Sequence, residues 1–159
     1  MGSRSTTVDA YIAGFLDGDG SLMLQIKKRH DGPMKFRFMA TICFYQDARH
    51  DKGLLWLRKQ LGIGYVAERN DGMSEIRING FTQVHDILVK LFPYLQFKKR
   101  QAAMLIRATQ ILSEIPFRML SARQKETIVD CVLAIQKENY VARRKKTRSE
   151  LCAIVGLTP

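Results

Sequence analysis

The sequence has 159 residues and 46% of them are hydrophobic, which suits one folded domain and excludes wholesale disorder. Lysine and arginine number 26 against 15 aspartates and glutamates, and the net charge of +11 favours a polyanionic partner, with nucleic acid ahead of an anionic membrane surface. No apolar run approaches the ~20 residues that span a bilayer, so no membrane segment is expected.

The cysteine pattern and the N-terminal composition concern the compartment. Cys43, Cys131 and Cys152 are odd in number and far apart, which fits neither a disulfide framework nor a CxxC metal site. No signal-peptide-like apolar stretch occurs near the N-terminus. We therefore expect an intracellular protein, located in an organelle or in a prokaryotic or archaeal cytoplasm.

The first two thirds of the chain alternate between helical and extended patterns. Apolar residues recur at helical spacing in some segments and every second position in others, and Asp-Gly pairs mark two turns between extended segments. The predicted elements, in chain order, are a helix over 8–16 that ends at Gly18 and Gly20, strands over 22–29 and 35–45, a helix over 51–61, strands over 63–69 and 73–79, and helices over 82–92 and 98–114.

The last third of the chain is predicted to be helical. Ser121-x-x-Gln124 has the form of a capping box for a helix to about residue 139, and Thr147-x-x-Glu150 has the same form before a short helix that ends at Gly156. The order αββαββα predicts an α+β domain with a four-stranded antiparallel sheet and helices on one face. We expect a single domain, with a core over about 7–115 and a helical extension over about 116–156.

Small residues form a stripe along the first predicted helix. Ala10, Ala13 and Gly14, with Asp17 following, recur at helical spacing. Such a stripe allows the backbone of another helix to approach closely. The alternative interpretation is that the stripe serves ordinary helix packing within one chain.

The same helix is expected to end in Asp-Gly-Asp-Gly, with Asp19 just past its C-terminus. Exposed carbonyl groups at a helix end carry partial negative charge, and a carboxylate beside them makes an oxygen-rich site suited to Mg²⁺. Gly18 would allow its carbonyl to point at the same cation. Two such helices side by side would bring two Asp19 carboxylates together around metal ions, which suits hydrolysis at phosphorus. Alternatively, the motif is only a turn in a monomeric basic nucleic-acid-binding module.

At this point the sequence resembles a known family. The segment from Ile12 to Ser21, IAGFLDGDGS, is similar to the signature of the LAGLIDADG homing endonucleases, and the likeness extends over roughly 11–101. Because the signature occurs once, the resemblance implies a homodimer, with Ala13 and Gly14 at the seam and Asp17 near the helix ends. It implies a metal-dependent double-strand break in DNA, in support of intron or intein homing.

The resemblance also implies roles for individual residues. Asp19 would be the principal metal ligand, with the Gly18 carbonyl assisting. Gln46 and Lys98 would organise water and stabilise charge. A further basic residue of the family falls at Arg49 or His50.

The outward-facing side chains of the sheets would then face the major groove of a long, pseudo-palindromic duplex of ~20 base pairs. The basic run Arg143–Arg148 would contact phosphates or remain solvated. Non-cleaving relatives leave an RNA maturase or a DNA-binding regulator on the same fold as alternatives, and a membrane-surface protein is a poorer fit. The predicted DNA-binding residues are Gln25, Lys27, Arg29, Lys35, Arg37, Thr41, Tyr45, Arg69, Glu75, Arg77 and Asn79.

Overall fold

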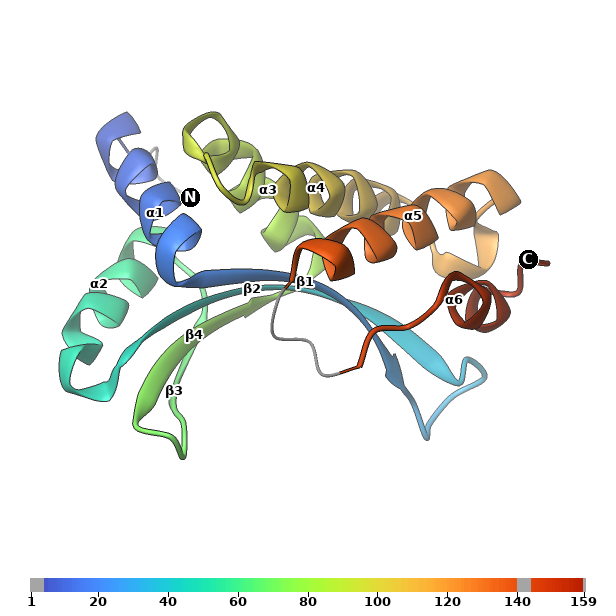
Figure 1. Cartoon of the computed structure of the whole chain (residues 1–159), viewed down its shortest axis with the longest axis horizontal. Helices are drawn as coiled ribbons and strands as arrows, with labels where there is room; N and C mark the ends of the chain where they lie inside the picture. Colours follow the sequence, from blue (N-terminus) through green and yellow to red (C-terminus); the bar gives the residue numbers. More distant parts are fainter. Residues whose placement is uncertain (1–4, 140–143, 159) are drawn as a thin grey trace.

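A computed structural model describes residues 5–139 and 144–158 (Figure 1). Its order confirms the predicted αββαββα core followed by further helices. No helix in these two stretches is long and apolar enough to cross a membrane. The elements are α1 (Thr6–Asp19), β1 (Gly20–Lys28), β2 (Phe36–Asp47), α2 (Asp51–Leu61), β3 (Tyr65–Glu68), β4 (Met73–Asn79), α3 (Phe81–Leu91), α4 (Lys99–Glu114), α5 (Ala122–Glu138) and α6 (Arg148–Val155).

The four strands form one sheet in the order β1-β2-β4-β3, and every neighbouring pair is antiparallel. The register places Leu22 opposite Ile42, and Ile42 opposite Ile78, so that buried apolar side chains share one face. Lys27 and Arg37 form a cross-strand pair at an odd-numbered row, which points to the other face. The sheet therefore has one apolar face and one face that carries basic side chains.

The sheet is arched, with helices packed on its convex side and the concave side left open (Figure 1). Fully buried side chains from α1, such as Ile12 and Leu16, pack with Phe44 and Ile42 of β2 in the main core. Burial of this apolar surface is the dominant force that holds the helices on the sheet. The four-stranded antiparallel sheet with helices on one face matches the prediction.

The end of α1 differs from the prediction. The helix does not stop at Leu16 but continues through Gly18 to Asp19, and Gly20 follows in extended conformation. The Gly20 amide donates a hydrogen bond to the carbonyl of Leu16, and a Cβ on Gly20 would lie 2.7 Å from that oxygen. Glycine is therefore required where the helix turns directly into β1. As a result, Asp19 is the last helical residue rather than the first residue beyond the helix.

The C-terminal helices begin as predicted, because both capping boxes are present at the starts of α5 and α6. Beyond α5, the Asn139 side-chain amide donates a hydrogen bond to the carbonyl of Leu22 (3.1 Å) and accepts one from Gln101 (3.0 Å). These contacts tie the end of α5 and the start of α4 to the edge strand β1. Arg143, the first residue of the basic run, lies outside the described residues.

Candidate active site and nucleic-acid interface

The C-terminal end of α1 presents oxygen atoms to solvent. Asp19 is exposed, and Gly18 precedes it at the helix end, where backbone carbonyls lack partners from a following turn. This donor set fits a hard divalent cation such as Mg²⁺. Within residues 5–139 and 144–158, no three His, Cys, Asp or Glu side chains are grouped closely enough to hold a metal ion.

Lys98 reaches the same helix end from a distant part of the sequence. Its Nζ donates a hydrogen bond to the Asp17 carbonyl (2.7 Å). Burial lowers the pKa of Lys98, and the carboxylates of Asp17 and Asp19 oppose that shift. The structure thus places Lys98 at the end of α1 that carries Asp19.

Asp17 is engaged within its own chain. Its carboxylate accepts backbone hydrogen bonds from Gln96 (2.7 Å), Phe97 (3.2 Å) and Lys98 (2.9 Å). Asp17 therefore holds the segment before α4. The sequence placed Asp17 near the dimer seam and did not predict this contact within one chain.

Gln46 lies inside β2, because that strand runs to Asp47 rather than ending at residue 45. Its Oε1 accepts a hydrogen bond from the Asp47 amide (2.9 Å). A groove between α1 and α2 is lined by Asp19 and Gln46 together with both basic candidates, Arg49 and His50. Gln46 and Asp19 thus line the same groove. Lys98 does not line it.

The outer face of α1 corrects one predicted interface residue. Ala13 has no exposed surface, because it lies on the side of the helix that packs on the core. Ala10, Gly14 and Gly18 are exposed instead. A Cβ on Gly14 or Gly18 would meet nothing within 4 Å, so this strip is open to a close neighbour.

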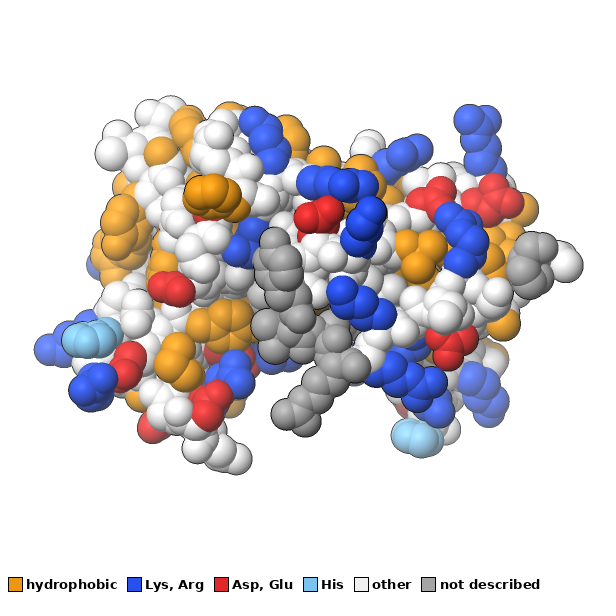
Figure 2. All heavy atoms as spheres, viewed as in Figure 1, with side chains coloured by type: hydrophobic (Ala, Val, Ile, Leu, Met, Phe, Trp, Pro, Cys, Tyr) orange, Lys and Arg blue, Asp and Glu red, His pale blue; other side chains and the backbone are white. Residues whose placement is uncertain are grey.

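Exposed aromatic residues border that strip. Tyr11 of α1 is 65% exposed and packs edge-on against Trp56 of α2, with ring centroids 5.5 Å apart. Figure 2 shows hydrophobic side chains gathered at this end of the molecule, at the left of the view. Together with the small-residue strip, this surface suits contact with another protein chain.

The open face of the sheet carries most of the predicted DNA-binding residues. Arg29, Lys35 and Arg69 lie just beyond strand ends. The remaining members occupy strand positions of one alternating set, namely Gln25, Lys27, Arg37, Thr41, Tyr45, Glu75, Arg77 and Asn79.

Thr41 is a correction within this set. It has no exposed surface, because it sits in a central strand between Met23 of β1 and Asn79 of β4. Its hydroxyl donates a hydrogen bond to the Asn79 side chain (2.7 Å). In this structure Thr41 therefore orients Asn79 and presents nothing to a base.

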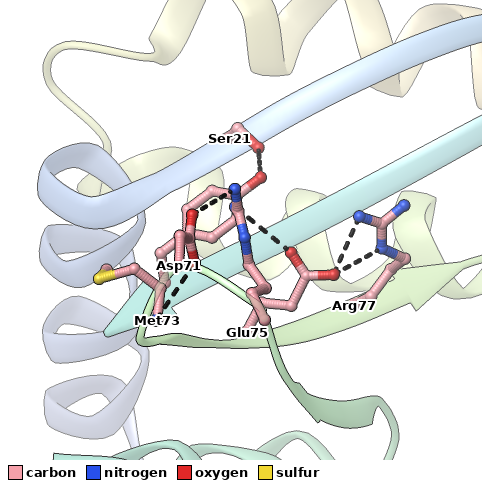
Figure 3. Close-up of polar contacts among 7 residues, drawn as sticks. Ser21, Asp71, Met73, Glu75 and Arg77 are labelled. Carbon is pink, nitrogen blue, oxygen red and sulfur yellow. Dashed lines mark hydrogen bonds and ion pairs between the residues drawn. The ribbon is translucent and has the colours of Figure 1, made fainter. Parts of the chain in front are cut away.

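A network of ion pairs crosses the open face near the β3–β4 turn (Figure 3). Arg77 donates to the Glu75 carboxylate from Nε (3.2 Å) and Nη2 (3.0 Å). Arg69 pairs with Asp71 (2.9 Å) and lies over the Tyr45 ring, 5.6 Å from its centroid. The predicted base-reading arginines are thus held in place by acidic neighbours.

Sequence reasoning missed two side chains of this surface. Ser21 is hydrogen-bonded to the Tyr45 hydroxyl (2.9 Å), and Figure 3 labels Ser21 and draws this bond as a dashed line. Tyr65 is 72% exposed and lies opposite Arg77 in the register. The period of two that relates Tyr65 to Arg69 would have identified it as an outward residue.

The fold and the site together define a class of protein. Its members have an arched antiparallel sheet covered by helices, and a carboxylate at the end of a helix with an exposed face of small residues. A sequence model described as LAGLIDADG endonuclease matches residues 12–112. The chain belongs to this family, which confirms the resemblance seen in the sequence.

Two relatives are similar over most of their length. The chain is 34% identical to DNA endonuclease I-CvuI of Chlorella vulgaris over 137 residues, which cover 86% of this chain and 81% of the relative. It is 30% identical to DNA endonuclease I-CreI of Chlamydomonas reinhardtii over 143 residues, or 88% and 83% of the two chains.

Solved structures agree with this fold. A crystal structure of homing endonuclease I-CvuI, in complex with the I-CreI target and in the presence of Mg, matches with a TM-score of 0.78 and 27% identity, and covers 96% of this chain and 97% of that one. An archaeal intron-encoded homing endonuclease, I-Vdi141I complexed with DNA, matches with a TM-score of 0.80 at 21% identity, over 96% and 97% of the two chains. The second match supports the fold alone.

Proposed function

We propose that the protein is a site-specific DNA endonuclease that acts as a homodimer and makes a Mg²⁺-dependent double-strand break in a long, pseudo-palindromic duplex. The observation that carries the proposal is the exposed carboxylate of Asp19 at the end of an exposed helix face of small residues. A two-fold axis along that face would bring a second Asp19 to the first. Membership of the family and the identity to two DNA endonucleases support the same reaction.

The chain's own residues have distinct parts in this mechanism. Asp19 and the Gly18 carbonyl would hold a divalent cation, which when bound activates water and neutralises charge on the leaving oxygen. Lys98 at the end of α1 would stabilise the negative charge of the phosphate. Gln46, in the groove beside Asp19, would orient water with its amide group. Arg49 or His50 in the same groove would assist with positive charge.

The concave sheet would bind the major grooves that flank the cleavage site. A strand of ~10 residues at ~3.3 Å per residue spans about 33 Å, which matches ~10 base pairs per protomer. Arginine and lysine recognise guanine, and glutamine and asparagine recognise adenine. Glu75 is buried and paired with Arg77, so it would orient that arginine rather than contact a base. Such breaks at a long target would support the homing of an intron or intein, with each chain of 159 residues acting as one domain.

Selection of cleaved sites from a random duplex library tests this function directly. With Mg²⁺ present, we expect cleaved molecules to share a pseudo-palindrome of about 20 base pairs, and gel filtration to show a dimer. EDTA serves as the control and should abolish cleavage. Enrichment of bound but uncleaved duplexes would instead indicate a DNA-binding regulator, and preferential binding of RNA would indicate a maturase.

A further inference from the structure

Asp17 makes four hydrogen bonds to a segment about eighty residues away in the sequence. Its Oδ2 accepts from the amides of Gln96 and Phe97, and its Oδ1 accepts from the amide of Lys98. The Lys98 ammonium in turn donates to the Asp17 backbone carbonyl (2.7 Å). The carboxylate and the backbone carbonyl of Asp17 are therefore both hydrogen-bonded to the residues that precede α4.

These bonds lie at the entry to α4. Lys98 is the N-cap residue of α4, and its side chain makes no capping hydrogen bond. Amide groups at a helix start need acceptors, and a carboxylate is favoured there by the helix dipole. Asp17 accepts from the amide of the N-cap residue Lys98 and from the two amides before it, so the segment that leads into α4 is fixed against the end of α1.

The arrangement determines where the Lys98 ammonium lies. One of its three N–H groups is directed to the Asp17 carbonyl, which leaves two donors for other acceptors. The Asp17 carbonyl is two residues before Asp19 on the same helix end. Hydrogen bonds to α1 thus hold both the backbone of residues 96–98 and the tip of the Lys98 side chain in place.

The same bonds argue against Asp17 as a metal ligand. Its two carboxylate oxygens already accept three backbone N–H groups. Asp19, two residues further along, is exposed, and no group of three metal-ligating side chains occurs in the described part of the chain. The two aspartates of the motif therefore have different surroundings and suit different tasks.

Resting on the proposed nuclease function, we propose that Asp17 is a positioning residue for DNA cleavage, whose carboxylate holds residues 96–98 so that the Lys98 ammonium stays at the end of α1 that carries Asp19. Substitution of Asp17 acts on the reaction through Lys98 and leaves DNA binding intact. This role differs from a simple contribution to folding, because it predicts coupling between residues 17 and 98 in the cleavage rate.

The test is a double-mutant cycle on single-turnover cleavage of the selected duplex with Mg²⁺. Asp17→Asn keeps the size of the side chain but turns N–H donors toward backbone donors, and we expect its cleavage rate to fall about 100-fold, as for a misplacement of about 1 Å. The duplex Kd should stay within about threefold. In a Lys98→Ala background, Asp17→Asn should lower the rate no further.

Ser121→Ala is the matched control, because it removes a side-chain cap from α5, away from Asp19. It should lower the melting temperature but leave the rate unchanged. Equal effects of Asp17→Asn with and without Lys98, or an equal rate loss in Ser121→Ala, would overturn the proposal. If Asp17→Asn does not fold, Asp17→Glu decides: a slower rate at unchanged Kd supports the role, and an unchanged rate rejects it.

Failure of the proposed function is distinguishable in the same experiment. If the wild-type protein cleaves no duplex with Mg²⁺, the nuclease assignment is wrong. If the wild type cleaves and Asp17→Asn cleaves equally fast, only the positioning role is wrong. Exchange protection of the amides of residues 96–98, high in the wild type and lost in Asp17→Asn, provides a readout independent of cleavage.

Discussion

The end of α1 and the open face of the sheet are built in different ways. At the end of α1, one carboxylate accepts three backbone amides, and Lys98 donates to a backbone carbonyl. On the sheet, side chains bond to other side chains, as in the pairing of Arg77 with Glu75. The first region is held by contacts to the main chain. In the second region the side chains contact one another, and individual side chains can be replaced without a change in the backbone of the sheet.

This difference separates chemistry from recognition. Cleavage needs atoms held within fractions of an ångström, and backbone contacts between α1 and the segment before α4 suit that need. Recognition is a sum of base contacts, each worth about 1–3 kcal/mol, which can change one at a time. We therefore expect all-or-none effects at the end of α1 and graded effects across the sheet.

Asp19→Asn should have the largest effect. The amide keeps the shape of the side chain but removes the charge that a divalent cation requires, so we expect cleavage to fall on the order of 1000-fold or more. The duplex Kd, measured by fluorescence anisotropy in Ca²⁺, should be unchanged. Cleavage of a plasmid target at the wild-type rate would reject Asp19 as the principal ligand.

The sequence predicted most of what positions this residue. Period-two alternation, Asp-Gly turns and capping boxes are local signals, and the strands, the hairpins and the starts of α5 and α6 followed from them. The extension of α1 to Asp19 was missed because glycine in a helix is locally unfavourable, and only the packing of Gly20 on Leu16 decides where the turn falls.

Two site residues show what local patterns cannot supply. Ala13 belongs to the small-residue stripe by spacing, but the core takes one side of the helix and leaves Gly14 on the other. Thr41 has the correct alternation, but its neighbours on both flanking strands cover it. The bonds from Asp17 to residues 96–98 are contacts between distant segments, which no periodicity encodes.

Gly14→Leu should break the homodimer. In the single chain its Cβ meets nothing within 4 Å, and leucine is a better helix former by up to about 1 kcal/mol, so folding should be kept. Across a two-fold axis the overpacking applies twice at about 1–3 kcal/mol each, which raises the dimer Kd about 30-fold or more.

Sedimentation velocity measures this change, and cleavage should fall with it. Ala122→Leu places the same side chain at an exposed position on α5 and serves as the control. A Gly14→Leu protein that remains dimeric and active would show that the exposed strip of α1 is not the seam.

Arg77→Ala should have a smaller, positional effect. Loss of one bidentate base contact costs about 1–3 kcal/mol of discrimination, and we expect it at one base pair in each half-site. Binding to duplexes with single substitutions measures the change, and Arg123→Ala on α5 is the control. A uniform loss of affinity for every duplex would show that Arg77 contacts phosphate rather than a base.

Tyr45→Phe should have the smallest effect. It removes the hydroxyl that is hydrogen-bonded to Ser21 but keeps the ring beneath Arg69. A part-buried neutral hydrogen bond contributes about 0.5–1.5 kcal/mol to the free energy of unfolding, and urea denaturation should show a loss of that size. Ser21→Ala removes the same bond from its other end, so the double variant should lose little more than either single variant. Because the ring and the backbone of residue 45 stay in place, cleavage should continue at close to the wild-type rate. A large loss of cleavage in Tyr45→Phe would mean that the sheet face and the end of α1 are coupled and not separable regions.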